Sequence, residues 1–305
     1  MGGSGGGGTS YGTGDTDPDA LRDRVQRSLQ QQELQVQIND YLREQLATYN
    51  DRDTDAVGRR LDQIAQTLSE DVESLDRLMF GGSVAKHTYV DGLSDVDALV
   101  ILRGRQSDNP AELIRSFAAS LQNAVPAGTV VTPGNLAVTV TYSDGSEVQL
   151  LPARRSGDRL SIASEDGRGW REIRPRKFAE KLTQVNQANS GAVVPAIKLA
   201  KGMMSSLPSS DQLAGYHVEA IAVDAFKAYS GSNSRQAVLR HLLDHAATAV
   251  LKPTGDITGQ SVHIDGHLGA ANSPDRQRIS ASIRRLVNRM DGATSVDDYR
   301  DLFGE

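Results

Sequence analysis

The 305-residue chain contains no cysteine. It therefore has no disulfide, no thiolate nucleophile and no cysteine-based zinc site. It also has no long hydrophobic run, because no stretch approaches the roughly 20 apolar residues that a membrane-spanning helix needs. The N-terminus lacks the basic start and apolar core of a signal peptide. From these absences we expect a cytoplasmic protein that does not associate with membranes.

An excess of basic charge is also missing. Lysine and arginine number 33 against 39 acidic residues, which gives a formal net charge of −6. This balance argues against stable binding of duplex nucleic acid, although it allows a local basic channel. Hydrophobic residues make up 38% and charged residues 24% of the chain, as is usual for a globular protein. The length suits one large domain or two closely packed ones.

The first 18 residues are rich in glycine and contain one aromatic side chain, Tyr11. Such a segment cannot bury a core, so we expect a flexible tail. Tyr11 has two interpretations, a solvated side chain or a mobile hydroxyl that reaches an active site.

The sequence features that indicate chemistry are concentrated in residues 80–102, where a Gly-Gly-Ser turn precedes Asp95-Val96-Asp97 and a β-prone apolar run. In a strand, Asp95 and Asp97 share one face, roughly 6.5 Å apart along the backbone. Two converging carboxylates suit Mg²⁺, and two such ions can clamp the attacking and leaving oxygens of a phosphoryl transfer. Gly82 lets backbone amides approach an anion, and a helix that opens at Ser83 would favour a triphosphate.

Each part of this motif also has an ordinary explanation. An Asp-x-Asp pair in a chain with 39 acidic residues is usually a solvated strand end, and Gly-Gly-Ser is a common turn. The ordered combination of the two, with a strand on either side, favours a nucleotide site.

The patterns around the motif predict a mixture of helices and strands. Asp17-Pro18 starts a helix that runs to about Tyr49, and Asn109-Pro110 starts another. The expected ranges are a helical pattern over 57–75, strands over 129–132, 137–142 and 147–151, and helices over 193–201, 215–226, 234–250 and from 274 onward.

The motif resembles the signature of the polymerase-β-like nucleotidyltransferases. Within them the chain is similar, over roughly residues 25–290, to the cGAS/DncV-like nucleotidyltransferases (CD-NTases) of bacterial anti-phage defence. The resemblance implies an α+β fold with a catalytic sheet, an N-terminal spine helix and a helical C-terminal half, with the nucleotide cleft between the halves. The implied domains are a tail over 1–18, a catalytic domain over 19–185 and a helical domain over 186–305.

The resemblance also implies a function. These enzymes make nucleotide second messengers, cyclic or short and linear, from NTPs or dNTPs, with ATP or dATP as plausible substrates here. Asp95 and Asp97 would bind Mg²⁺, for which Mn²⁺ can substitute. A downstream effector protein would sense the product.

The sequence departs from the family at the third acidic position. The family pattern places an aspartate where this chain has Gln149, within Val148-Gln149-Leu150-Leu151-Pro152-Ala153. Glutamine can offer an oxygen to a metal but carries no charge and is no base. Glu147 lies two residues earlier on the same strand face. Either Glu147 supplies the third carboxylate, or two aspartates suffice, or the protein is inactive; we favour the first.

Two lysines follow in the helix that begins near Val193. Lys198 and Lys201, at i and i+3, lie on neighbouring positions of one face. A lysine in such a helix contacts the triphosphate in the family, and this role transfers to Lys198 first and Lys201 second. The alternative is a pair of exposed lysines. The basic residues between 154 and 180 are either a rim that attracts phosphates or a solvated loop.

Two rival functions remain open. Gln149 favours a nucleotide-binding module without catalysis, which would bind triphosphates with Mg²⁺ but release no pyrophosphate. Tyr11 raises a second possibility, a protein-primed enzyme that starts a short DNA oligomer on its own hydroxyl.

Overall fold

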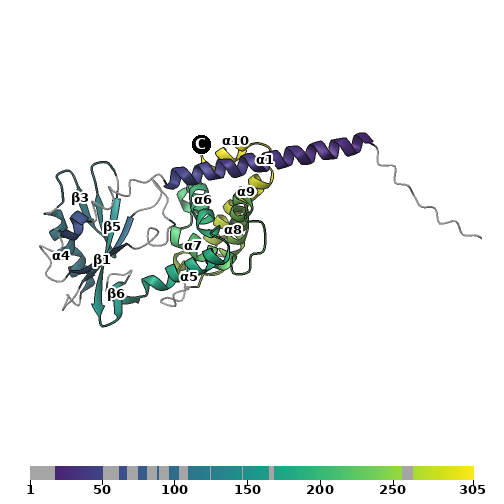
Figure 1. Ribbon diagram of the computed structural model, residues 1–305. Coiled ribbons are helices and arrows are strands. Elements are labelled where there is room, and N and C mark those ends of the chain that lie inside the picture. The colour runs from purple at the N-terminus through teal and green to yellow at the C-terminus, as the bar shows by residue number, and fades with distance from the viewer. Residues whose placement is uncertain are drawn as a thin grey trace, which may run out of the picture.

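The structure of the chain is a computed structural model (Figure 1). The described residues are 18–50, 62–66, 75–80, 88, 96–102, 109–123, 125–145, 147–164, 168–255 and 264–305, with backbone alone at 18, 75–80, 96, 97 and 175.

One mixed sheet forms the left-hand part of Figure 1. Its order is β1-β2-β5-β4-β3, and β6 continues from β5 to β7. The pairing of β2 with β5 is parallel, and every other pairing described is antiparallel. The strands are β1 (Leu75–Phe80), β2 (Val96–Leu102), β3 (Val130–Pro133), β4 (Val138–Thr141), β5 (Glu147–Ser156), β6 (Arg159–Ala163) and β7 (Trp170–Ile173).

Helices form the rest of the described chain. They are α1 (Pro18–Asn50), α4 (Pro110–Gln122), α5 (Pro175–Ala188), α6 (Val193–Ser205), α7 (Gly215–Ala225), α8 (Arg235–Ala249), α9 (Pro274–Asp291) and α10 (Val296–Phe303). Short 3₁₀ turns occur at Ser209–Asp211 and Gly266–Leu268, and residues 62–66 are helical. Within the described residues, no helix combines the length and apolarity that a membrane crossing requires.

Helix α4 covers one face of the sheet. Its N-cap is Asn109, whose side chain accepts a hydrogen bond of 3.0 Å from the Ala111 amide, and proline follows at the first helical position. Every second residue of strands β2, β4 and β5 packs beneath it, because side chains alternate between the two faces of a sheet. The shared core contains Leu113, Ile114, Phe117 and Leu121 from the helix and Ala98, Val100, Leu102, Val138, Val140, Val148 and Leu150 from the strands.

The strand residues of opposite parity form a second, smaller core on the other face. Leu99, Ile101 and Ala153 are buried there, and Leu160 of β6 and Ile173 of β7 pack against them. Beta-branched and leucine side chains on both faces of β2 account for the continuous apolar run after Asp97.

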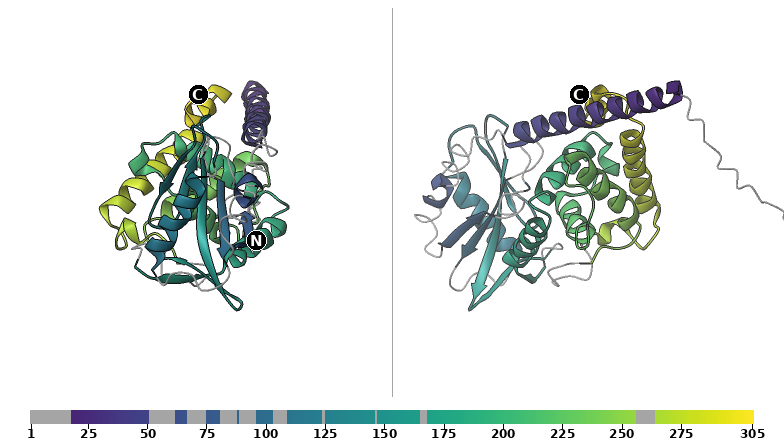
Figure 2. Two further views of the ribbon diagram at one scale, coloured as in Figure 1. Left: turned by 90° about the vertical axis from the view of Figure 1, so that its left-hand side faces the viewer. Right: turned by 45° about the vertical axis from the view of Figure 1, so that its right-hand side comes forward.

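The helical half has the largest core, which includes parts of α1 and α5. Figure 2 shows the arrangement of the helices from two further sides. From α1 it takes the buried residues Ile38, Tyr41, Leu42 and Leu46. Helix α5 contributes Phe178, Leu182 and Val185, and α6 to α10 supply most of the remainder. Each helix presents its apolar positions at spacings of three and four residues, which is why these segments fold as one bundle.

A polar cluster is buried inside this half. The Arg276 guanidinium, fully buried on α9, donates to the Asp265 carboxylate at 2.8 Å and to four backbone carbonyls. The His217 Nε2 atom lies 3.3 Å from the Asp265 Oδ2 atom and 2.9 Å from the Thr254 hydroxyl. Burial lowers the pKa of His217 to about 4, against the opposing attraction of Asp265 and with Arg276 adding to the shift. The imidazole is therefore neutral near pH 7.

Several element predictions are confirmed and others need correction. Helices α1, α4, α6, α7, α8 and α9 and strands β3, β4 and β5 lie where the patterns predict them. The helical pattern over 57–75 was wrong at its end, because Leu75 begins strand β1. The basic stretch after residue 154 is not one loop, since it includes the end of β5, β6, β7 and the start of α5. Helices α5 and α10 and strands β6 and β7 were missed.

Candidate active site

The parallel pairing of β2 with β5 brings together the candidate metal-binding segments. The backbone of Asp97 is in register with Gln149, and the first pair of the two strands is Val96 with Val148. Glu147 precedes that pair at the start of β5. Residues that stand 52 positions apart in the sequence therefore lie side by side on neighbouring strands.

Glu147 and Gln149 lie on the sheet face opposite α4. Their neighbours Val148 and Leu150 are buried against α4, and alternation along the strand sends Glu147 and Gln149 the other way. Glu147 is exposed, and its Oε1 atom accepts a hydrogen bond of 2.9 Å from the Thr141 hydroxyl on β4. This carboxylate is thus held at the start of the strand, in contact with solvent.

Some predicted site residues lie outside the described residues. These are Gly82, Ser83 and Asp95, together with Tyr11 in the tail. Within residues 81–95, the structure describes Thr88 alone, and it is completely buried.

Lys201 contacts this segment from α6. Its Nζ atom donates to the Thr88 carbonyl at 3.0 Å and lies 2.9 Å from the Glu219 Oε1 atom on α7. The Thr88 hydroxyl donates to the same Glu219 oxygen. The side chain of Lys201 is 8% exposed and that of Glu219 is 1% exposed. The three groups form a buried link between the motif segment and two helices.

Lys198 is placed differently, although it is one turn away on the same helix. Its Nζ atom donates to the Asn50 Oδ1 atom at 2.5 Å, at the last residue of α1. Lys198 is half-buried, so its ammonium remains accessible to solvent. The structure therefore separates the two lysines that the sequence treated as alternatives.

Sequence reasoning missed Glu219 and Thr88. Glu219 carries a signal in retrospect, because it is a lone acidic residue in the otherwise apolar run Val218–Val223. A carboxylate at such a position must be paired when the helix is buried. Thr88 carries no comparable signal, since a single threonine between Ser83 and Asp95 does not indicate burial.

The basic stretch after β5 contributes one notable contact. The Arg154 guanidinium lies over the Trp170 ring, 4.4 Å from its centroid, and so joins β5 to β7. This stacking orients one cation of the predicted basic rim.

The oxygen donors present suit a hard divalent cation. A carboxylate at Glu147 and an amide oxygen at Gln149 stand beside the strand that carries Asp97, and such oxygens are the ligands of Mg²⁺. Across the described part of the chain, which omits Asp95, no group of three metal-binding side chains converges. The donor set fits the cation, and its completion depends on the two aspartates.

Comparison with known proteins rests on structure alone. No protein-family model matches the sequence, and no curated protein is significantly similar to it. The chain is similar to CdnC of E. coli MS115-1, solved with ATP, at a TM-score of 0.66 and 18% identity over 82% of this chain and 90% of that one. It is also similar to the CD-NTase CdnG of Bradyrhizobium diazoefficiens, solved with GTP, at a TM-score of 0.63 and 13% identity over 81% and 88% of the two chains.

A third structure extends the likeness to a named synthase. Vibrio cholerae DncV, a cyclic AMP-GMP synthase solved with a linear intermediate, matches at a TM-score of 0.58 and 10% identity over 91% of this chain and 86% of that one. At such identities the likeness concerns the fold. The chain has the fold of the CD-NTases, and the resemblance seen in its sequence is confirmed at that level.

Proposed function

We propose that this protein is a metal-dependent nucleotidyltransferase that acts in the cytoplasm. Its product would be a nucleotide second messenger, cyclic or short and linear, made from NTPs or dNTPs in anti-phage defence. Nucleotide complexes are known for similar folds, with ATP for CdnC and GTP for CdnG.

One observation supports this proposal above the others. Strand β2, whose second residue is Asp97, pairs in parallel with β5, whose first and third residues are Glu147 and Gln149. Parallel strands start at the same edge of a sheet, so the acidic side chains at the starts of β2 and β5 would converge there. That is the arrangement a phosphoryl-transfer site requires.

The chain's own residues would divide the work. Asp95 and Asp97 would hold Mg²⁺ with help from Glu147, and the bound cation would neutralise charge that develops on the reacting phosphate. Gly82 and Ser83 would offer amides and a hydroxyl to the triphosphate, and Gln149 would hold the nucleotide through its amide. Lys198, the more accessible of the two lysines, would balance the phosphate charge. An acceptor hydroxyl would attack the α-phosphorus in line, with pyrophosphate as the leaving group.

Gln149 supports a second candidate function. If the third carboxylate is essential, a neutral amide at this position leaves a module that binds triphosphates without catalysis. That module would show Mg²⁺-dependent ATP binding and no pyrophosphate release.

The deciding experiment incubates the protein with each labelled NTP and dNTP, singly and mixed, with Mg²⁺ or Mn²⁺. Products are resolved on a gel and by mass spectrometry, and pyrophosphate is measured. The inactivating variant is Asp97→Asn, and its matched control is Asp62→Asn, at an exposed position of the helical segment 62–66. We expect a product that Asp97→Asn abolishes and Asp62→Asn retains. Binding without pyrophosphate release would favour the second candidate function. Full activity of Asp97→Asn would refute the proposed metal-dependent catalysis.

A further inference from the structure

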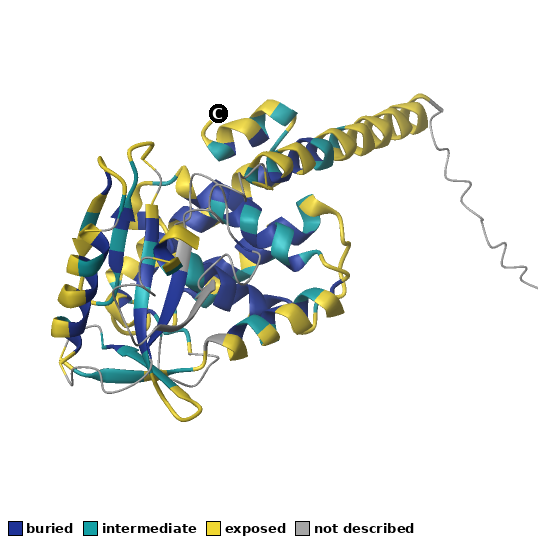
Figure 3. Ribbon diagram, turned by 60° about the vertical axis from the view of Figure 1, so that its left-hand side comes forward, coloured by how far each residue is buried: buried dark blue, intermediate teal, exposed yellow. Residues whose placement is uncertain are grey.

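The N-terminal part of α1 extends beyond the rest of the fold. Every residue from 19 to 33 is exposed, and Figure 3 shows this end of the helix as an uncovered rod. An isolated helix of this length is marginal in water, since most helical stability in proteins comes from packing of one face. The segment therefore needs a partner for its apolar side chains.

Those apolar side chains gather on one face. The large hydrophobic residues most exposed in the described chain are five, and four of them lie on α1: Leu21, Val25, Leu29 and Val36, which are 51%, 52%, 59% and 61% exposed. At about 100° per residue, the four fall within an arc of about 80°. We call this set the α1 stripe.

The α1 stripe is distinct from the face by which α1 joins the helical core. The core face is formed by Leu34, Ile38, Tyr41, Leu42 and Leu46. The helical wheel separates the centres of the two faces by about 140°. The stripe is therefore not an extension of the core face beyond the bundle.

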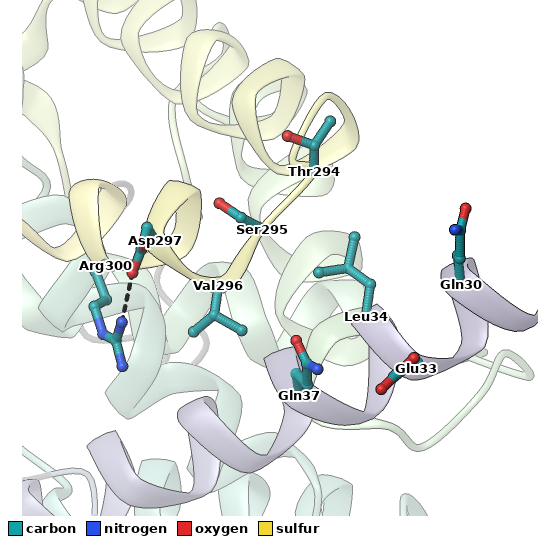
Figure 4. Close-up of a pocket in the computed structure, with 9 residues that line it drawn as sticks. All are labelled: Gln30, Glu33, Leu34, Gln37, Thr294, Ser295, Val296, Asp297 and Arg300. Carbon is teal, nitrogen blue, oxygen red and sulfur yellow. Dashed lines mark hydrogen bonds and ion pairs between the residues drawn. The ribbon is translucent and has the colours of Figure 1, made fainter. Parts of the chain in front are cut away.

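Helix α10 approaches α1 on a third side and leaves the stripe uncovered. A hollow of about 450 Å³ lies between these two helices, and Figure 4 shows the residues that line it. Its lining from α1 is Gln30, Glu33, Leu34 and Gln37. None of the four stripe residues takes part in that lining.

We propose that the α1 stripe binds the same stripe of a second copy of this chain, with the two helices antiparallel. In this arrangement Leu21 of one copy packs beside Val36 of the other, about a two-fold axis near Ser28 and Leu29. The interface is isologous, as in most homodimers. The helical half of each copy then lies beside the outer end of the other copy's helix.

Charge complementarity selects this occupant and this direction. Arg22 and Glu33 flank the same edge of the stripe near its opposite ends, and both are exposed. Antiparallel pairing brings Arg22 of each copy close to Glu33 of the other. A parallel pair would instead place Arg22 beside Arg24, which flanks the other edge. On that other edge, antiparallel pairing sets Arg24 near the neutral Gln31 and Gln35.

The interface is small, so the dimer is expected to depend on concentration. Four half-exposed apolar residues per copy correspond to the low end of interface sizes, where complexes are weak. Analytical ultracentrifugation of the full chain between about 1 and 200 µM should show mass rising from 32.7 kDa towards twice that value.

The test compares matched lysine substitutions on one helix. Val25→Lys should weaken dimerisation by about tenfold or more, because it places two cations at the apolar contact. Gln30→Lys adds the same charge on the far side of the helix and should leave the dimer intact. Arg22→Glu and Glu33→Arg should each weaken it, and the double variant should restore it. Circular dichroism and the melting temperature serve as folding controls for each variant.

Direction is tested by cross-linking, which is clean because the chain has no cysteine. The double variant Leu21→Cys/Val36→Cys should form disulfide-linked dimers on mild oxidation, whereas Leu21→Cys alone should not. A chain that remains monomeric at all concentrations, for example because its own residues 1–17 cover the stripe, would overturn the proposal. So would a dimer that Val25→Lys leaves unchanged, or efficient cross-linking by Leu21→Cys alone.

Discussion

Lys201 and Glu219 form an ion pair of 2.9 Å inside the protein, and both also bind Thr88. The pair joins α6 and α7 to the segment between the Gly-Gly-Ser turn and the two aspartates. Lys201, which the sequence suggested as a ligand of the triphosphate, thus makes a structural contact with Glu219 and Thr88.

Removal of one member of this pair should destabilise the protein strongly. Lys201→Met leaves the Glu219 carboxylate buried without its cation, and Glu219→Gln leaves the ammonium without its carboxylate. The loss of a single partner in a buried pair costs about 3–5 kcal/mol. Urea unfolding at pH 7 measures this free energy.

Lys198→Met is the matched control, on the same helix and with the same chemistry. Its ammonium bonds to Asn50 in a half-buried setting, so the cost should be below about 1 kcal/mol. The double variant Lys201→Met/Glu219→Leu should regain part of the stability, since an apolar pair leaves no buried charge. Equal losses for Lys198→Met and Lys201→Met would contradict this account of the pair.

The local pattern predicts most elements of the fold, because the same apolar spacings that define a helix or strand also define its buried face. Asn109-Pro110 marks the start of α4, and the Asp-Gly turn separates β4 from β5. The register of β2 on β5 is also consistent with the sequence, since both strands carry their polar residues at the same end.

The contacts that join distant elements could not be predicted in this way. Glu219 and Lys201 are 18 positions apart, and Thr88 and Lys201 are 113 apart, so their meeting depends on how the helices pack. The α1 stripe was likewise hidden, because a spacing of three to five residues fits both Leu21–Leu29 and Leu34–Leu46. Only the fold shows which of the two sets packs against the bundle and which is left exposed.

The buried His217 should make stability depend on pH in a defined window. Burial lowers the pKa of this imidazole to about 4 in the folded protein, whereas an unfolded histidine titrates near 6.5. Between these values the unfolded chain binds more protons, so stability falls as the pH drops from about 6.5 to about 4. The full loss from this group is about 3 kcal/mol, and it levels off at lower pH.

Urea unfolding at intervals between pH 7 and pH 4 would measure this dependence. His217→Gln should flatten the curve within that window, while His245→Gln, at a more exposed position beside Asp224, should retain the slope. Asp265 has a pKa below its usual value: burial alone would raise it, but hydrogen bonds from Arg276 and Thr254 and the charge of His217 outweigh burial. The stability that the ionised Asp265 contributes is therefore lost only at a lower pH. An unchanged slope in His217→Gln would show that the imidazole is not kept neutral by the fold.

The contribution of Glu147 decides how a site with Gln149 can work. If Glu147 supplies the third carboxylate, Glu147→Gln should lower product formation by at least about tenfold and raise the Mg²⁺ concentration needed for half-maximal rate. Thr141→Val, which removes only the hydroxyl bonded to Glu147, should have a smaller effect. Gln149→Asp adds a carboxylate in register with Asp97 and should lower the Mg²⁺ requirement, whereas Gln149→Asn should not. Product yield and pyrophosphate release across a Mg²⁺ titration measure the effects of all four variants.

Full activity of Glu147→Gln together with a gain in Gln149→Asp would instead mean that two aspartates suffice, because a carboxylate at the third position would then add rate without being required.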